Sequence, residues 1–416
     1  MCKKATISAI FEQFGPAVKR SFQLSKEQHK VLNLVGLCRT GKLGAHKEKC
    51  NSCGYTKIHY NSCDERSELR KLGAMHQKTS PHCPNCQGVN KERWYLDRLD
   101  DLLPVKYFHG VFTVPSELRN LFRYNKKVLY NLLFKCSWET IKEFGLDKRQ
   151  KMLAKVGMIG ILHTWTQKMQ YHPHLHCIIP SGGINEEGVW KRSKGKQNFL
   201  FSVRALSSKF KQKFLHHLVA LFKAGKLILP VNDLRWNSTR KFYQTKRKLY
   251  LKKWVVYAKP PFGGAEQVLE YLGRYTHRIA ISNYRILELT TKHVTFSYLD
   301  RKRGTVEREQ IRGEEFVLRF LQHVLPKRFT KIRHYGFLST RSKSVDLPKI
   351  RRALKVKDPP AKKKWSARQI MIKTQGKDPY ICPKCQLAEL VVVAVFPSIR
   401  GSPPRFFSRD KKVRLL

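Results

Sequence analysis

The segment HPHLHCIIP, residues 172–180, decides which fold this sequence predicts. It follows the β-rich run GMIGILHTWTQ, residues 157–167, after a few polar residues, and a Ser-Gly-Gly turn comes directly after it. Two runs of this kind joined by a short polar connection are typical of neighbouring strands in a hairpin. We therefore expect the two segments to pair as adjacent antiparallel strands.

Three histidines stand at alternate positions of the second run, which suggests a chemical role for it. Because side chains alternate between the two faces of a strand, His172, His174 and His176 project from one face, with alternate α-carbons ~6–7 Å apart. Two or three imidazoles at that spacing can converge on one metal ion. The alternative is ordinary surface histidines, with His172 packed as a cap of the strand. Three histidines at period two, followed by the apolar run 177–179, favour the metal site.

The rest of the chain contains further strand-like and helix-like segments. Strands are predicted over residues 105–115, 254–260, 279–290 and 293–300, and helices over Lys26–Leu37 and residues 116–144, 265–278 and 313–325. The strands are too many for a helical bundle, and no GxGxxG motif follows a strand. The sequence therefore predicts the α+β class, with an antiparallel sheet and helices.

Charge and hydropathy favour a nucleic-acid-binding protein over a membrane protein. The chain has 416 residues, of which 41% are hydrophobic, enough for a large core and two or three domains. With 83 Lys and Arg against 30 Asp and Glu, the formal net charge is +53, an excess tolerated mainly beside a polyanion. No apolar run reaches the ~18 residues that span a bilayer, and the N-terminus lacks the pattern of a signal peptide. We expect a cytoplasmic protein that binds nucleic acid and has no membrane partner.

Six of the 11 cysteines lie between residues 38 and 86, which in a reducing compartment indicates metal binding. They include two C-x2-C pairs, a spacing that lets two sulfurs from one turn reach a single zinc ion, and His46 lies near the first pair. Either one site with spare cysteines or two sites would fit, and the alternative is buried thiols without metal. The predicted zinc ligands are Cys38, Cys50, Cys53, Cys63, Cys83 and Cys86.

A third C-x2-C pair stands far away in the sequence, at Cys382 and Cys385. It has no obvious partner near it in the chain. The pair is either half of a zinc ribbon or a remnant, and the sequence favours neither interpretation.

Two tyrosines in the segment EYLGRYTHR form a further candidate site. Tyr271 and Tyr275 are spaced i, i+4, which places them on one face of a helix, ~6 Å apart along its axis. An aromatic stripe packed on the sheet would have the same spacing. The neighbouring Arg274, His277 and Arg278 fit a surface that faces phosphate better than a core.

These three features, in this order, resemble the two-tyrosine HUH rolling-circle transposases of bacterial insertion sequences, of the insertion-sequence-91 type, with their N-terminal zinc-binding domain. The resemblance runs from about Cys38 to Arg352. Its motifs are CNSCGY, NSC and HCPNCQ within 50–87, HTWTQ and YHPHLHCIIPSGG within 163–183, and YLGRYTHRIAISNYR at 271–285. Each motif alone is weak, whereas the combination is specific.

The resemblance implies an HUH-endonuclease fold, an antiparallel RRM- or palm-like sheet with helices, plus a small N-terminal zinc-binding module. The HUH histidines belong on a central strand and the nucleophilic tyrosines on a neighbouring helix. Residue by residue, His174 and His176 match the HUH pair that binds the divalent metal, and Tyr271 and Tyr275 match the catalytic tyrosines. The candidates for a third metal ligand are His172, His163, Gln267 and His277.

The resemblance also implies a reaction. In this family Mg2+ or Mn2+ polarises the scissile phosphate of single-stranded DNA, and a tyrosine attacks it to give a 5′-phosphotyrosine linkage and a free 3′-OH. The implied function is rolling-circle DNA transposition, with single-stranded DNA at the element ends and target as partner, in the cytoplasm in contact with the nucleoid. Rejoining then needs no ATP, which agrees with a sequence that has no P-loop motif. Which tyrosine acts first, the oligomeric state and the recognised DNA sequence stay open.

Four domains are predicted: a helical lead-in over residues 1–37, a zinc-binding domain over 38–100, an HUH transposase catalytic domain over 101–356, and a basic C-terminal tail over 357–416. One alternative function is a non-catalytic, zinc-dependent DNA-binding protein, such as a repressor or an inactivated transposase copy. A replication initiator or relaxase with the same chemistry is another. The histidine strand and the tyrosine pair favour an enzyme, because a pure binding protein has no use for both.

Overall fold

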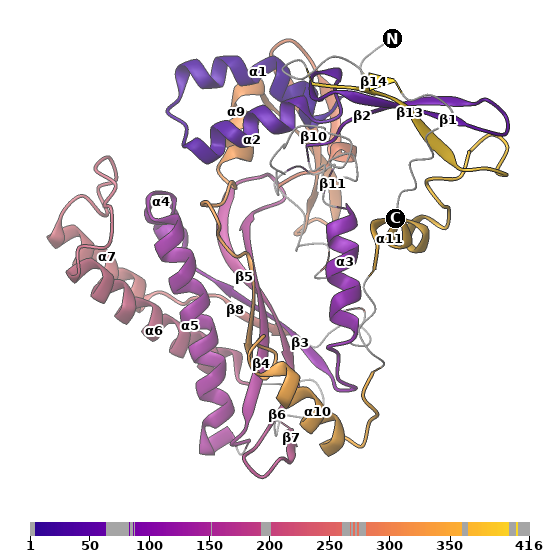
Figure 1. Ribbon diagram of the computed structural model, residues 1–416. Helices are drawn as coiled ribbons and strands as arrows, with labels where there is room; N and C mark the ends of the chain where they lie inside the picture. The colour runs from indigo at the N-terminus through magenta and orange to yellow at the C-terminus, as the bar shows by residue number, and fades with distance from the viewer. Residues whose placement is uncertain are drawn as a thin grey trace.

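The computed structural model describes residues 5–63, 83, 86, 88–150, 152–192, 201–259, 267, 269–270, 273, 280–359, 365–398 and 405–406. Within them the chain forms three sheets, and helices pack against two of them (Figure 1). Every strand pair described is antiparallel. The predicted α+β class is therefore confirmed. No described helix is both long and apolar enough to cross a membrane.

The largest sheet has seven strands, in the order β7-β6-β4-β5-β3-β8, with β12 paired to β4 as well. The predicted strand pair is present as β4 and β5, and β5 lies between β4 and β3 in the middle of the sheet. The histidines therefore stand on a central strand. The strands are β3 (Tyr107–Thr113), β4 (Lys155–Trp165), β5 (Tyr171–Pro180), β6 (Gly182–Ile184), β7 (Trp190–Arg192), β8 (Val256–Lys259) and β12 (Ile332–Gly336).

One face of this sheet packs against α5 and α6. Leu175, Cys177 and Ile179 of β5 point to this side and belong to the largest hydrophobic core, together with apolar residues of both helices. The predicted helix over 116–144 is broken at Asn125, whose side chain binds the backbone of Leu121 and Ile228. Helices α6 and α7 had no counterpart in the prediction. The helices here are α4 (Arg119–Tyr124), α5 (Lys126–Leu146), α6 (Val203–Lys223) and α7 (Thr239–Leu251).

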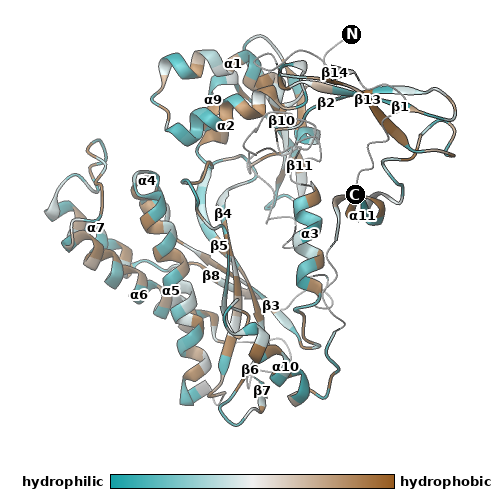
Figure 2. Ribbon diagram, viewed as in Figure 1, coloured by the Kyte–Doolittle hydropathy of each residue, from teal (hydrophilic) through white to brown (hydrophobic). Residues whose placement is uncertain are grey.

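The opposite face of the sheet carries the histidines and a second apolar core. Ile178 of β5 and Ile161 of β4 point to this side and pack with residues of α3 (Gly88–Leu99) and α10 (Lys343–Ala353). Leu269 is buried in the same core. Figure 2 shows that the strands are largely hydrophobic where the helices cover them.

The N-terminal helices α1 (Ile7–Ser21) and α2 (Lys26–Leu37) pack against α9 (Gly313–Leu321), with the rings of Phe11 and Phe320 5.1 Å apart. Helix α2 has the predicted bounds, and a capping box at Ser25 fixes its start. The same core includes the three-stranded sheet β9 (Ile286–Leu289), β10 (His293–Asp300) and β11 (Thr305–Arg312). The predicted lead-in thus forms one packed unit with residues 286–321 (Figure 1).

The third sheet joins the two ends of the chain. Its order is β14-β13-β1-β2, with β1 (Ala45–Cys50), β2 (Thr56–Tyr60), β13 (Leu390–Phe396) and β14 (Arg405–Phe406). Cys50 pairs with Leu390, and Ala45 pairs with Phe396. The segment predicted as a basic tail therefore contributes strands to this terminal sheet, and α11 (Ala367–Gln375) precedes them. The predicted domain boundaries stay predictions.

Short 3-10 turns connect several of these elements. They lie at Gly41–Leu43, Ser116–Leu118, Lys148–Gln150 and Asn283–Arg285.

Candidate functional site

Three histidine side chains meet on the central sheet, on the face that also carries Ile161 and Ile178. His163 of β4 lies directly opposite His174 of β5 in the strand register, and His176 is two residues farther along β5. His174 Nε2 is 3.0 Å from His163 Nδ1 and 3.2 Å from His176 Nε2. All three side chains are buried, and their ring nitrogens are close enough to hold one metal ion.

The hydrogen bonds of these histidines indicate which ring nitrogens carry protons. His174 Nδ1 lies 2.6 Å from the carbonyl oxygen of His172, so Nδ1 donates and Nε2 keeps its lone pair. Burial lowers the pKa of His174 to about 3 and the pKa values of His163 and His176 well below their ordinary value. The imidazoles are thus neutral at pH 7, and neutral imidazole is the form that binds metal.

This donor set fits a divalent cation. The Nε2 atom of His174 lies 3.2 Å from His176 Nε2 and 3.0 Å from His163 Nδ1, so one cation could accept a lone pair from each of the three rings. Three imidazoles suit transition metals better than they suit Mg2+, which prefers oxygen ligands.

The structure separates the candidates for the third ligand. His163 joins His174 and His176, whereas the Nδ1 atom of His172 is 3.1 Å from Arg119 Nη2 and faces that guanidinium. Gln267 is exposed and His277 lies outside the described residues. His163 is therefore the third ligand that the geometry supports.

Two further groups lie beside the histidines and were missed in the sequence. His109 Nε2 of β3 is 2.8 Å from His176 Nδ1, and Lys331 is partly buried with its ammonium 5.1 Å from the ring of Trp165. Burial lowers the pKa of Lys331 to about 7. His109 stands in a segment predicted as a strand, but the register that brings it to His176 cannot be read from one sequence.

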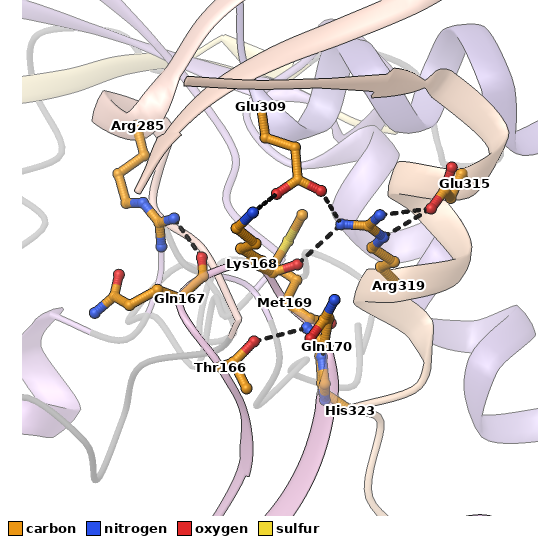
Figure 3. Close-up of polar contacts among 10 residues, drawn as sticks. All are labelled: Thr166, Gln167, Lys168, Met169, Gln170, Arg285, Glu309, Glu315, Arg319 and His323. Atoms are coloured by element: carbon orange, nitrogen blue, oxygen red, sulfur yellow. Dashed lines mark hydrogen bonds and ion pairs between the residues drawn. The ribbon is translucent and has the colours of Figure 1, made fainter. Parts of the chain in front are cut away.

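The connection between β4 and β5, residues 166–170, is held by three side chains from the β9–β11 and α9 region (Figure 3). Arg285, Arg319 and His323 each donate to a carbonyl of this connection. Arg285 Nη2 reaches Gln167 O at 2.6 Å, Arg319 Nη1 reaches Lys168 O at 3.1 Å, and His323 Nε2 reaches Met169 O at 3.0 Å. Three consecutive carbonyls are thereby satisfied, which fixes the end of the hairpin that carries the metal histidines.

Tyr271 and Tyr275, the predicted nucleophiles, lie outside the described residues. Neighbouring residues of the same segment are described. Leu269 is buried among apolar residues of the histidine-bearing face, and a β-carbon added at Gly273 would lie 3.6 Å from Lys91 Cε of α3. These two residues therefore lie on the same side of the sheet as the histidines.

Four of the six predicted zinc ligands come together. Cys38 Sγ lies 3.5 Å from the sulfurs of Cys83 and Cys86, and Cys63 Sγ lies 3.6 Å from that of Cys86. A tetrahedral ion with bonds of about 2.3 Å separates its sulfurs by about 3.8 Å, so the four thiols fit zinc closely. We call them the first cysteine group.

The other two predicted ligands, Cys50 and Cys53, do not belong to the first cysteine group. They lie with Cys382 and Cys385, and we call these four the second cysteine group. His46 is in neither group as far as the described residues go, and instead forms an ion pair with Glu48.

Comparisons with known proteins agree with this organisation. Residues 157–345 match the family model described as "Putative transposase", and residues 10–67 and 74–114 match the model described as "Transposase zinc-binding domain". The chain is 37% identical over 409 residues to "Putative transposase y4qJ" of Sinorhizobium fredii, covering 96% of this chain and 97% of the relative.

A second relative is the "Transposase for insertion sequence element IS801" of Pseudomonas savastanoi pv. phaseolicola. The identity is 26% over 372 residues, covering 86% of this chain and 82% of the relative. No solved structure gives a significant match.

Proposed function

Because the chain belongs to the transposases of the insertion-sequence-91 type, we propose that it nicks and rejoins single-stranded DNA in rolling-circle transposition. The observation that carries this proposal is the cluster of His163, His174 and His176 on a central strand pair. A protein that only binds DNA has no need for three buried, neutral imidazoles around one point.

In this proposal the three histidines hold Mg2+ or Mn2+, with His163 as the third ligand. A divalent cation bound there would withdraw charge from the scissile phosphate and make its phosphorus more electrophilic. The hydrogen bonds to His174 Nδ1 and His176 Nδ1 keep the Nε2 atoms of both rings directed at the site.

Tyr271 and Tyr275 are the proposed nucleophiles. A phenol with a pKa of about 10 must lose its proton to a base or to water before or during attack. Its oxygen then forms a bond to phosphorus, the bond from phosphorus to the 3′ oxygen breaks, and that oxygen takes up a proton to give a free 3′-OH. The DNA is left with its 5′ phosphate on the tyrosine. Attack by a 3′-OH on this linkage reverses the steps and rejoins a strand.

Positive charge near the histidines supports DNA as the substrate. The charge of Arg301, in the exposed turn after β10, contributes to the lowered pKa values of His174 and His176. A cation this close to the site can attract the phosphate backbone, and the net charge of +53 supports a longer DNA path. We expect the protein to act in the cytoplasm, in contact with the nucleoid.

The zinc-binding module has a structural part in the proposal. The first cysteine group, Cys38, Cys63, Cys83 and Cys86, is expected to hold zinc and to stabilise the fold around it. Its cysteines belong to the same core as α1, α2 and α9, so that zinc would link the module to the unit that holds the β4–β5 connection.

The test is incubation of the full chain with single-stranded oligonucleotides from the ends of the element and Mn2+, followed by denaturing electrophoresis. We expect a covalent protein–DNA adduct that EDTA abolishes. The double substitution Tyr271→Phe, Tyr275→Phe should also abolish it, while Tyr284→Phe, at an exposed tyrosine of the same region, should not. An adduct that persists in the double variant contradicts the tyrosine assignment. Tight DNA binding without any adduct would support the non-catalytic alternative.

A further inference from the structure

Four cysteines from opposite ends of the chain meet beside the β1–β13 strand pair. Cys50 is the last residue of β1 and Cys53 follows it, whereas Cys382 and Cys385 precede β13. We propose that this second cysteine group is a zinc site that fastens the C-terminal strand to the N-terminal sheet. The match to the transposase zinc-binding domain ends at residue 114, so half of the ligands lie outside it.

The sulfur positions fit a tetrahedral ion. Cys50 Sγ is 3.6 Å from Cys385 Sγ, and Cys53 Sγ is 3.6 Å from Cys382 Sγ. All four sulfurs lie within 4.8 Å of one another. An ion with four thiolates at about 2.3 Å requires sulfur separations of about 3.8 Å. Close sulfur contacts therefore run between the two pairs, which is what a shared ion requires.

The two pairs are built into matching turns, although their sequences differ. The N–H of Gly54 donates to Cys50 O at 3.1 Å, and the N–H of Gln386 donates to Cys382 O at 3.0 Å. Both donors have a left-handed backbone, with φ of 70° at Gly54 and 56° at Gln386. This conformation is ordinary for glycine and rare for glutamine, so the second turn keeps its shape against the preference of its own residue.

Each turn is also closed by a second backbone hydrogen bond. Cys50 N donates to Tyr55 O at 2.8 Å, and Cys382 N donates to Ala388 O at 2.9 Å. Two such turns that face each other, each presenting two sulfurs, are the arrangement of a four-cysteine zinc ribbon. The turn at Cys382 thus resolves the choice that the sequence left open in favour of half a ribbon.

The packing around the second cysteine group explains why an ion would be needed. Its core holds three buried residues, Cys50, Cys382 and Leu390, two of them cysteines. So small an apolar core offers little to hold together segments more than 300 residues apart in the chain. Small domains with too little core commonly rely on a structural metal. The zinc-binding module would then be completed only by the C-terminal segment.

The inference does not depend on the proposed nuclease activity, because it is tested by counting zinc in the full-length protein. Mass spectrometry of the metal content and mercurial titration with a zinc indicator should give two zinc ions per chain. The double substitution Cys382→Ser, Cys385→Ser should leave one, and so should Cys50→Ser, Cys53→Ser. Combining all four should still leave one, because both pairs serve the same ion.

A matched control comes from the first cysteine group. Cys38→Ser with Cys63→Ser should also remove one zinc, and adding Cys382→Ser, Cys385→Ser should remove the remaining one. Two zinc ions retained in the Cys382→Ser, Cys385→Ser variant would overturn the proposal. So would a loss of both ions from the quadruple variant of the second cysteine group, if that variant is folded.

A conservative variant guards against loss of zinc through misfolding. Cys382→His keeps a zinc ligand at the position and should retain two ions. Cobalt substitution gives a second readout, since thiolate-to-cobalt charge-transfer absorption grows with the number of thiolates bound. That absorption should fall by about half in Cys382→Ser, Cys385→Ser, as eight thiolates become four. Unchanged absorption per chain would contradict the shared site.

Discussion

His109 of β3 and His176 of β5 are joined by a hydrogen bond, with 2.8 Å between Nε2 of the first and Nδ1 of the second. Their rings are stacked, with centroids 5.1 Å apart. His109 is not among the three residues that can hold the metal, but the bond fixes the ring of His176 with its Nε2 facing His174. His109 is therefore a positioning residue, of the kind that metal-binding histidines commonly have.

Removing this positioning residue should weaken the metal site. For His109→Ala we expect an affinity for Mn2+ about 10- to 100-fold lower, because the ring of His176 is free to turn. Isothermal titration of the zinc-loaded protein with Mn2+ measures it. His334→Ala is the control, since His334 is also a partly buried histidine of the sheet but contacts Arg98. Equal affinities in the two variants would contradict the role of His109.

The third ligand can be identified by comparing two histidines. His163→Ala should lose Mn2+ binding almost completely, because its Nδ1 is 3.0 Å from His174 Nε2. His172→Ala should bind Mn2+ nearly as the native protein does, because His172 faces Arg119. Electron paramagnetic resonance of free Mn2+ gives both affinities. If the His172 variant loses the metal and the His163 variant keeps it, our assignment is wrong.

Burial of the histidines predicts how stability depends on pH. Burial lowers the pKa of His174 to about 3 in the folded protein, whereas histidine in the unfolded chain has a pKa of about 6.5. Between these two pH values the unfolded chain binds a proton at His174 and the folded protein does not. The stabilisation is therefore complete above pH 6.5 and is lost as pH falls towards 3. Between pH 6.5 and pH 5 His174 alone should account for about 1.6 kcal/mol of the free energy of unfolding.

Urea unfolding without Mg2+ or Mn2+ tests this. The difference in the free energy of unfolding between the native protein and His174→Gln should shrink by that amount from pH 6.5 to pH 5, with zinc and all other groups unchanged. A constant difference would show that His174 titrates normally in the folded state.

The β4–β5 connection should depend on Arg319. This guanidinium binds Lys168 O and lies 2.7 Å from Glu309 and 2.6 Å from Glu315. Arg319→Ala removes the donor to Lys168 O and to Glu315, and leaves Glu309 with Lys168 alone, so it should lower the free energy of unfolding by about 2 kcal/mol. The control is Arg312→Ala, whose side chain is 77% exposed and whose nearest pairing, to Glu314, is 3.8 Å. If Arg319→Ala lowers the free energy of unfolding no more than Arg312→Ala does, Arg319 does not hold the β4–β5 connection.

Arg301 should contribute to DNA binding more than its neighbour Arg303. Arg301 acts on the histidines electrostatically, whereas Arg303 lies 3.9 Å from Glu307. Arg301→Ala should weaken single-stranded DNA binding and reduce the slope of log K against log salt by about 0.7, one phosphate contact. Fluorescence anisotropy over a range of salt concentrations measures it. If Arg303→Ala weakens DNA binding more than Arg301→Ala does, the DNA does not run past Arg301 to the histidines.

Local patterns in the sequence were enough for much of the central sheet. The alternation of HPHLHCIIP set the faces of β5, so that His174 and His176 share one face while Leu175 points to the helices. Helix α2 was predicted with its observed bounds, and the capping box that starts it involves only Ser25 and Gln28. These features depend on neighbours in the chain and are readable without the fold.

Features that depend on distant pairing could not be predicted. The second cysteine group requires the register of β1 with β13, and no local signal at Cys382 indicates a partner at Cys50. His109 reaches His176 because β3 pairs with β5, which one sequence does not reveal. Helices α6 and α7 are a different case, because Phe210, Phe214 and Leu218 of α6 recur at helical spacing and this local signal was overlooked.

The pairing of Cys50 with Leu390 has a consequence for synthesis, because 340 residues separate the two partners. At roughly 5–20 residues per second, the ribosome would need about 20–70 seconds to supply the second partner after the first. During this interval the edge of β1 that later pairs with β13 has no strand beside it. A truncated translation product that lacks β13 cannot form this strand pair. The complete terminal sheet therefore forms only on a polypeptide that has been extended through Leu390–Phe396.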